Sequence, residues 1–328
     1  MRFESLVIRH TSLSNRYSSF DMNSSDSQPQ SDVWSDWLLH IRHGDDPGHE
    51  RALHVELKHH VDRVLDGARL TPGMTLADIG AGDGLIGLSA IDRIGPSLRV
   101  LLTDISAPLL RHAEALAVQR NIQDQCVFIQ GSAESLDGIE DGAVDAVATR
   151  AVLAYVTDKM AALREFHRIL RPGGRLSIAE PIMRDDAIEA SSLRKIVEGL
   201  PEKAGDNFFH LLHRWKSAQF PDTEEKIAAS PIANYGERDL VRFALDAGFA
   251  NIHLEFHIDV RPAAVTSWDV LLGSSPHPWA PRLGDILATQ FTVDERLFFE
   301  QILRPQVEAR RLVMAERTAY LTAQKPLR

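Results

Sequence analysis

The sequence predicts a doubly wound α/β fold, a largely parallel sheet with helices on both faces. Two observations predict it. Short continuous apolar runs alternate with amphipathic helical stretches, and the first of these runs leads into three glycines at alternate positions. Short apolar strands separated by helices are typical of parallel sheets, because their strands are buried on both faces. We find no internal repeat of the solenoid type.

The expected elements of the core follow one another between residues 74 and 181. Strands are expected at 74–80, 98–105, 126–132, 144–150 and 175–181. Helices are expected between them at 84–93, 107–120 and 158–170. In the last of these helices, Ala161, Leu163, Phe166 and Leu170 make one apolar stripe. We expect the run Pro172-Gly173-Gly174 to end that helix.

Segments before, within and after this alternation define the expected domains. Residues 1–30 are polar and Ser-rich, and we expect a disordered tail because little there can be buried. The other expected parts are a helical segment (31–70), a core (71–182), a helical insertion (183–235), the continued core (236–260), a second insertion (261–311) and a last strand with the C-terminus (312–328). Insertions at this end of a sheet would form a lid over a binding crevice.

Composition limits the partners and the compartment. The chain has 36 Lys+Arg against 46 Asp+Glu and no basic run, which disfavours nucleic acid as a partner because phosphates are neutralised by Lys and Arg. Cys126 is the only cysteine, so neither an intrachain disulfide nor a thiolate metal cage can form. No apolar stretch approaches the roughly 18 residues that span a bilayer. We expect a cytoplasmic protein with no membrane partner and no metal, and leave a homodimer open.

A glycine-rich turn joins the first expected strand to its helix. It contains Gly80, Gly82 and Gly84, and glycine permits both a sharp turn and a close approach of a ligand to the backbone. Free N–H groups at the helix start can meet a polar or anionic group of that ligand. Asp104 ends the second strand about 20 residues further on, where an acid meets ribose hydroxyls in nucleotide folds. The two features together predict an adenosine-containing ligand.

The glycine spacing favours S-adenosylmethionine over a dinucleotide. A dinucleotide site usually reads G-x-G-x-x-G and holds a pyrophosphate. This turn reads G-x-G-x-G, and Asp78 lies two residues before its first glycine. A carboxylate there would repel a pyrophosphate but suits a cationic amino-acid group. The residues expected to bind this cosubstrate include Asp78, Gly80, Ala81, Gly82, Gly84, Asp104 and Ile105.

Three segments resemble the class I S-adenosylmethionine-dependent methyltransferases, particularly the ubiquinone/menaquinone-biosynthesis type. They are the turn 78–84, Asp104, and the helix-turn-strand segment 163–176, within a resemblance that covers residues 70–181. The resemblance implies a Rossmann-like methyltransferase sheet of order 3-2-1-4-5-7-6 with the last strand antiparallel. It also implies methyl transfer as the activity.

Two segments depart from the family's pattern. The family often has an Asp in the loop after the third strand, where it holds the adenine amino group. Here that loop contains Ser132 and Ala133, so we assign one hydrogen bond to the Ser132 hydroxyl and the ring contact to the Ala133 backbone. The segment that begins at Thr149, which we also assign to the cosubstrate, lacks an Asn-Pro-Pro-Tyr-like motif. That motif commonly serves methylation of nucleobases or glutamine amides, so its absence favours another acceptor.

Candidates for the chemistry are few, because methyl transfer from a sulfonium mainly requires alignment of nucleophile and methyl group. A general base is needed only if the nucleophile must lose a proton. Arg150, at the end of the fourth strand, is predicted to hold a substrate carboxylate, with a structural ion pair as the alternative. Glu180, at the end of the fifth strand, could orient an amine or act as base. His210 shares a helix face with His213 and is a candidate for an acid-base or metal role, with chance proximity as the alternative.

Two tryptophans precede the core at helical spacing. We interpret Trp34 and Trp37 as core residues rather than as a lid over the cosubstrate.

The expected function is therefore methyl transfer from S-adenosylmethionine to a small molecule, such as a secondary metabolite, by in-line displacement. Two other hypotheses stay open at this point. One is another enzyme on the same architecture, either an NAD-dependent dehydrogenase or a non-methylating cyclase or lyase. The other is a cofactor-binding regulatory or scaffold protein without turnover.

Overall fold

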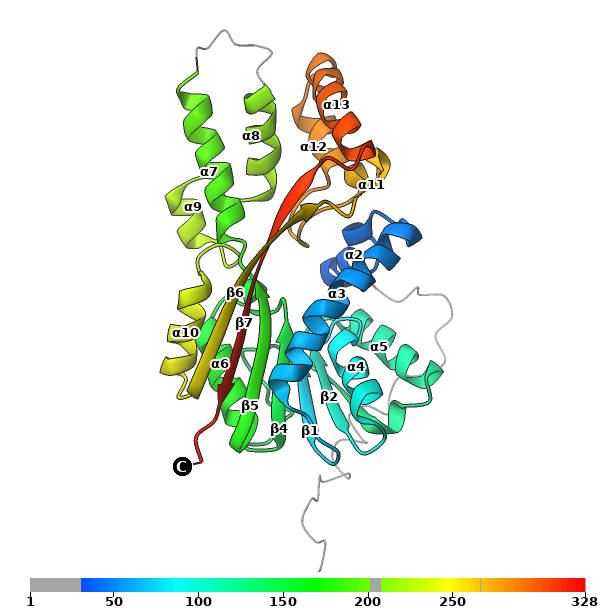
Figure 1. Cartoon of the computed structure of the whole chain (residues 1–328), viewed down its shortest axis with the longest axis vertical. Helices are drawn as coiled ribbons and strands as arrows, with labels where there is room; N and C mark the ends of the chain where they lie inside the picture. Colours follow the sequence, from blue (N-terminus) through cyan, green and yellow to red (C-terminus); the bar gives the residue numbers. More distant parts are fainter. Residues whose placement is uncertain (1–30, 201–207, 266, 328) are drawn as a thin grey trace, which may run out of the picture. The chain divides into compact units, whose positions relative to one another are not determined.

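Figure 1 shows a computed structural model of the chain, which describes residues 31–200, 208–265 and 267–327. All elements below belong to one compact unit that begins at Asp32. The predicted tail, residues 1–30, lies outside the described residues. Part of the first predicted insertion, residues 201–207, does too.

One sheet of seven strands forms the core, in the order β3-β2-β1-β4-β5-β7-β6. The strands are β1 (Thr75–Ile79), β2 (Arg99–Asp104), β3 (Cys126–Gln130), β4 (Val144–Arg150), β5 (Leu170–Pro181), β6 (Ala250–Pro262) and β7 (Val313–Gln324). Strands β1 to β5 pair in parallel, whereas β7 is antiparallel to both β5 and β6. The predicted fold class and strand order are confirmed.

Consecutive residues of β1 show how the sheet is buried on both faces. Leu76 belongs to a cluster with α3 (Pro47–Ala68), α4 (Leu85–Ile94) and α5 (Ala107–Gln119). Its neighbour Ala77 belongs to a second cluster, with α6 (Lys159–Ile169) and α10 (Glu237–Asp246) on the other face. Successive side chains of a strand point to opposite faces, so each strand must be apolar along its whole length.

The helix α6 ends earlier than its sequence pattern indicates. Its N-terminus is capped as expected, because the Asp158 carboxylate accepts a hydrogen bond from the Ala161 N–H at 2.9 Å. The helix stops at Ile169, and Leu170 is the first residue of β5 rather than the last of the stripe. The predicted turn Pro172-Gly173-Gly174 lies inside β5, where the pairing with β4 shifts in register. A proline has no N–H to donate, so an irregular stretch of the strand accommodates it.

The N-terminal helical segment consists of α2 (Val33–Leu39), a 3-10 turn η1 (Ile41–His43) and α3. Asp32 and Ser35 cap α2 reciprocally, each side chain bonding the other's backbone N–H. The helix α3 is fastened to the sheet where the Ser177 hydroxyl of β5 donates to the Val64 carbonyl at 2.7 Å. Apolar residues of α3 from Leu57 to Ala68 are buried against the sheet. The segment is thereby held beside the carboxyl ends of the strands.

The two insertions pack on each other. The first holds α7 (Arg184–Glu198), α8 (Phe208–Gln219) and α9 (Glu224–Ala229), and the second holds α11 (Trp268–Gly273), α12 (Leu283–Gln290) and α13 (Val293–Glu308). Leu211 of α8 and Phe299 of α13 share one apolar cluster, and Arg214 and Glu295 form an ion pair at 2.9 Å. Both insertions lie at the end of the sheet toward which β1, β4 and β5 run (Figure 1).

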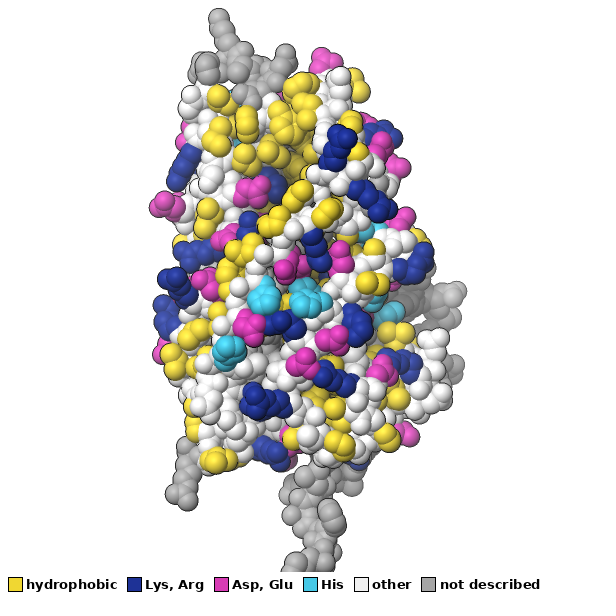
Figure 2. All heavy atoms as spheres, viewed as in Figure 1, with side chains coloured by type: hydrophobic (Ala, Val, Ile, Leu, Met, Phe, Trp, Pro, Cys, Tyr) yellow, Lys and Arg dark blue, Asp and Glu magenta, His cyan; other side chains and the backbone are white. Residues whose placement is uncertain are grey.

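Basic and acidic side chains are interspersed on the face shown in Figure 2, and no broad region of one sign is visible there. Histidine side chains gather near the middle of this face (Figure 2). Within the fold, the rings of His59 and His257 contact the Tyr320 ring of β7.

We expect Phe166→Ala to destabilise the protein by about 3–5 kcal/mol, the usual cost of emptying a fully buried aromatic site. Phe166 has no exposed surface and joins α6 to the sheet. The measurement is chemical denaturation followed by circular dichroism. Arg164→Ala, on the exposed side of the same helix, is the control and should change stability by less than about 0.5 kcal/mol. Equal effects of both substitutions would contradict the packing described.

Candidate cosubstrate and acceptor site

The glycine turn between β1 and α4 follows a path that only glycine adopts easily. Gly80, Gly82 and Gly84 have φ angles of 65°, 57° and 83°. A Cβ atom on Gly80 would collide with the side chain of Val152, and one on Gly82 would lie 3.1 Å from Leu38 Cδ2. The backbone of the turn therefore approaches its neighbours closely from both sides.

The carboxylate of Asp104 ties this turn to the end of β2. Its Oδ2 accepts from the Gly82 N–H and its Oδ1 from the Ser106 N–H, both at 2.8 Å. Burial raises the pKa of Asp104, and the two backbone hydrogen bonds act against that shift. Each carboxylate oxygen still has a lone pair free, so ribose hydroxyls can donate to the same group.

Asp78 is also buried, at 1% exposure. Its Oδ2 accepts from the Gly87 N–H in the first turn of α4 at 2.8 Å. Burial raises the pKa of this carboxyl to about 7, with the nearby Asp104 adding to the increase. A cation bound beside Asp78 would offset the loss of solvent and favour the ionised carboxylate. This geometry suits the amino group of an amino-acid moiety.

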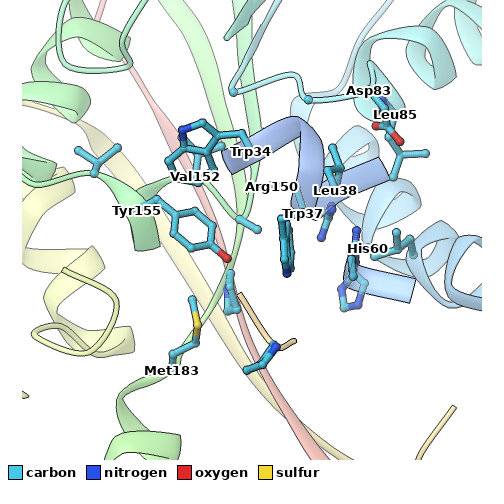
Figure 3. A pocket seen from close by; sticks show the side chains of 18 of the residues that line it. Trp34, Trp37, Leu38, His60, Asp83, Leu85, Arg150, Val152, Tyr155 and Met183 are labelled. Atoms are coloured by element: carbon cyan, nitrogen blue, oxygen red, sulfur yellow. Dashed lines mark hydrogen bonds between the residues drawn. The ribbon is translucent and has the colours of Figure 1, made fainter. Parts of the chain in front are cut away.

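A cavity of about 580 Å³ opens beside these groups (Figure 3). Most residues predicted to bind the cosubstrate line it: Asp78, Gly80, Ala81, Gly82, Asp104, Ile105, Ser132 and Ala133. Two do not. Gly84 ends the turn facing Leu88 and Ala113, and Thr149 is fully buried with its hydroxyl 3.4 Å from Glu180 Oε1. The backbone conformation at Gly84 thus shapes the turn, and Thr149 supports the sheet behind it.

Arg150 lies on the cavity wall, as predicted from its place at the end of β4. Within the described ranges, no carboxylate comes close enough to Arg150 to form an ion pair. Arg150 therefore forms no ion pair with the residues that the structure describes, and its role in binding a substrate stays a prediction.

Glu180 does not reach the cavity. It is fully buried, its Oε1 accepts from the Val152 N–H at 3.0 Å, and its Oε2 accepts from the Ala154 N–H at 3.2 Å. Burial raises the pKa of this carboxyl, and these backbone N–H groups oppose the rise. A side chain enclosed in this way cannot touch an acceptor, so the geometry corrects the predicted role: Glu180 holds the turn that follows β4.

Among the candidates for the chemistry, His210 is the second, after Glu180, that does not line the cavity. It lies on α8, away from the residues that form the cavity wall. Its neighbour His213 is engaged with Asp222, Nε2 to Oδ2 at 3.2 Å. Within the described ranges, no group of three His, Cys, Asp or Glu side chains is arranged to hold a metal ion. The acid-base or metal role predicted for His210 therefore has no support from its position.

The N-terminal segment contributes cavity residues that the sequence did not identify as such. Trp34, Trp37 and Arg42 all line the cavity, so the interpretation of the tryptophans as core residues was wrong. Trp37 Nε1 donates to the Ser275 carbonyl of the second insertion at 3.1 Å. The rings of Trp34 and Tyr155 meet edge to face at 5.2 Å. Helical spacing places both tryptophans on one face, but it does not say whether protein or a ligand covers that face.

A polar network joins α3 to β7 at the far side of the cavity. His60 Nε2 lies 2.9 Å from Glu316 Oε1, and His60 Nδ1 lies 2.5 Å from the Tyr320 hydroxyl. Arg261 of β6 pairs with the same Glu316 carboxylate. His60, Arg261 and Glu316 line the cavity. No sequence signal marks this network, because His60 lies about 200 residues or more before its other members and meets them only through the packing of α3 on the sheet.

We expect Asp104→Asn to weaken binding of S-adenosylhomocysteine roughly tenfold to a hundredfold, the range for a lost hydrogen bond to a charged group. An asparagine presents only one acceptor oxygen, and its NH₂ would face a backbone N–H. Isothermal titration calorimetry measures the affinity, and circular dichroism checks that the variant is folded. Asp66→Asn, on the exposed side of α3, is the matched control. Unchanged affinity in Asp104→Asn would contradict the ribose assignment.

The pKa of Asp78 predicts a pH dependence of cosubstrate binding. Below about 7 its carboxyl is protonated and no longer attracts an ammonium group. Affinity for S-adenosylhomocysteine should therefore fall about tenfold per pH unit below 7 and level off above it. Calorimetry between pH 5.5 and 8.5, as a set of roughly half-unit steps, measures this. In Asp78→Asn the dependence should disappear, and a profile identical to that of the wild type would rule out this role for Asp78.

The raised pKa of Asp78 also affects the stability of the fold. Cosubstrate affinity should increase with pH, whereas the contribution of Asp78 to stability should decrease with pH. Because the folded value lies above the ordinary 3.8, the folded state binds more protons than the unfolded state between 3.8 and about 7. The contribution of Asp78 to the free energy of unfolding therefore decreases as the pH rises through that window.

Comparison with known proteins agrees with the site geometry. Residues 77–178 match the family described as "Methyltransferase domain". A ubiquinone/menaquinone biosynthesis C-methyltransferase of Hahella chejuensis is 36% identical over 117 residues, which are 36% of this chain and 47% of that protein. The enzyme of the same name from Klebsiella pneumoniae is 29% identical over 198 residues, 58% of this chain and 76% of that protein. The chain thus spans about half of the first relative and about three quarters of the second.

Among solved structures, the YcgJ protein from Bacillus subtilis superposes with a TM-score of 0.52 at 16% identity. The match covers 82% of this chain and 99% of that one, and it concerns the fold. None of the helices in the part of the chain that the structure describes combines the length and the apolar character needed to cross a membrane.

Proposed function

Because residues 77–178 of this chain form a class I S-adenosylmethionine-dependent methyltransferase domain, we propose that the protein methylates a small molecule held in the same cavity as the cosubstrate. The observation that carries this proposal is that one cavity joins two different halves. The glycine turn, Asp78 and Asp104 form one half, and aromatic and apolar side chains of α2 and of the insertions, such as Trp34, Met183 and Phe220, form the other.

The cosubstrate, when bound, supplies a methyl group on a positively charged sulfur, which a nucleophile takes by in-line displacement. The chain's own residues then have two tasks. Asp104 and the glycine turn hold the nucleoside so that the methyl group faces the other half of the cavity. Trp34, Trp37 and Phe220 exclude water there and align the acceptor. No strong base is required at the reacting atom unless that atom carries a proton.

Several features support a small acceptor rather than a macromolecule. The insertions and the N-terminal helix border the cavity together, through Trp37, Met183 and Ser275, which limits the size of an entering molecule. The total charge of -10 does not suit a nucleic acid. Both bacterial relatives are named as enzymes of ubiquinone/menaquinone biosynthesis, and quinones are small molecules.

The alternative of a dehydrogenase has less support. The buried Asp78 carboxylate stands beside the turn where a dinucleotide would place its pyrophosphate. The matched family and both bacterial relatives are described as methyltransferases.

The test has two steps. Calorimetry on the wild-type protein should detect binding of S-adenosylmethionine and S-adenosylhomocysteine, and no binding of NADH. Incubation with methyl-labelled cosubstrate and a metabolite extract should then yield a labelled small molecule, with release of S-adenosylhomocysteine. Asp104→Asn is the control and should lose most of this labelling. Label in macromolecules only, or release of methylthioadenosine instead, would refute the proposal.

A further inference from the structure

Three polar groups on the cavity wall have no hydrogen bond or ion pair with any residue that the structure describes. They are the guanidinium groups of Arg42 and Arg150 and the hydroxyl of Tyr155. Each of the three side chains lies between buried and exposed. Polar groups in such places are normally paired, and a cation without a counter-charge is costly there. Their common direction into one cavity indicates a ligand with negative charge.

The two arginines act on each other unfavourably. Burial, and then the charge of Arg150, lower the pKa of Arg42 to about 10. Arg42 is otherwise stabilised by the ring of Trp37, 5.5 Å away. Like charges at one cavity are tolerated when a ligand brings anionic groups to both.

Arg42 belongs to the cosubstrate half of the cavity. It follows α2, whose Leu38 packs against the glycine turn at Gly82. The acid with the largest influence on Arg42 is Asp83, a residue of that turn. The carboxylate of the cosubstrate's amino-acid moiety, whose amino group we assign to Asp78, is the anion expected there.

Arg150 lies between the two halves, because its charge acts on the pKa values of Asp78 and Arg42 and also on those of Glu316 and Tyr320. On the acceptor side of Arg150 the other charges are already paired. Glu316 pairs with His60 and Arg261, and Glu56 lies 3.4 Å from the same Arg261. Asp186 lies 3.7 Å from Arg317. Among the described residues on this part of the wall, Arg150 is the cation that has no anion paired with it. One negative charge on the acceptor would balance it, whereas a doubly charged group would also meet repulsion from the three acids.

Tyr155 provides a neutral donor on the same cavity wall, near enough for the charges of Arg42 and then Arg150 to act on its pKa. Burial raises the pKa of its phenol, so the hydroxyl keeps its proton and donates a hydrogen bond. The rings of Tyr155, Trp34 and Trp279 contact one another edge to face, with ring centroids 5.2–5.8 Å apart. In Figure 3, Trp34, Tyr155 and Met183 lie on one side of the cavity, opposite Trp37 and His60. An apolar body can therefore lie beside the charged group.

We propose that the acceptor is an apolar monocarboxylate, whose carboxylate is bound by the Arg150 guanidinium and the Tyr155 hydroxyl while its apolar body lies against Trp34, Met183 and Phe220. The inference rests on the proposed function, since it concerns the acceptor half of the same cavity. A guanidinium can donate two parallel N–H groups to a carboxylate, and the phenol adds a third donor.

The test compares carboxylates with their matched alcohols. Wild-type protein saturated with S-adenosylhomocysteine is titrated calorimetrically with geranate, cinnamate and 1-naphthoate, and with geraniol, cinnamyl alcohol and 1-naphthalenemethanol. At least one acid should bind about tenfold or more tightly than its alcohol, as expected for charge-assisted hydrogen bonds. Arg150→Gln should remove this preference and leave the affinity for S-adenosylhomocysteine unchanged. Arg111→Gln, on the exposed side of α5, is the matched control and should keep the preference.

The cosubstrate itself supplies the competing explanation, because it also carries a carboxylate. If Arg150→Gln weakens S-adenosylhomocysteine but not methylthioadenosine, which lacks that group, then Arg150 binds the cosubstrate and the proposal is overturned. That pattern is the one we expect of Arg42→Gln instead. The proposal is also overturned if no acid of the set binds more tightly than its alcohol while S-adenosylhomocysteine binds normally. Failure of S-adenosylhomocysteine to bind the wild type would remove the proposed function itself.

Discussion

The two hydrogen bonds accepted by the Asp104 carboxylate hold the site together. One comes from the Gly82 N–H and the other from the Ser106 N–H, so a single side chain joins the glycine turn to the end of β2. The turn cannot relax away from this position, since Ala81 N–H also donates to the Thr103 carbonyl at 2.8 Å. Both the direction of α4 and the open wall of the cavity follow from this arrangement. The carboxylate that shapes the turn is thus the group assigned to the ribose.

The two halves of the cavity differ in how their charges are compensated. Asp78 and Asp104 are held by backbone N–H groups alone, so their negative charge is available to a cationic ligand. In the acceptor half, Glu316 is matched by His60 and Arg261. The methyl donor carries a positive sulfur and belongs beside the first pair of acids. The second half leaves a cation without a partner, and from this difference we infer the chemistry of the acceptor.

The strands and helices of the sheet could be predicted because local features determine them, whereas the strand order came from the resemblance to methyltransferases. Apolar runs of strand length, helical periods between them and the glycine turn all lie within short stretches of chain. Errors arose where an assignment depended on distant neighbours. Glu180 ends a strand as Arg150 does, yet its side chain turns into the protein and bonds the Val152 and Ala154 N–H groups. Position at a strand end gives the edge of the sheet, whereas the direction of the side chain depends on what packs there.

The sequence by itself determined the class of the cosubstrate, because the glycine turn and Asp104 act through backbone geometry and one carboxylate within a single β-α-β stretch. Only the tertiary structure decided the acceptor half. Trp37 of α2, Arg150 of β4 and Glu316 of β7 meet there from distant parts of the chain. Their proximity is set by sheet order and by helices packed on its end, and no local pattern in the sequence encodes which charges remain unpaired once those elements meet.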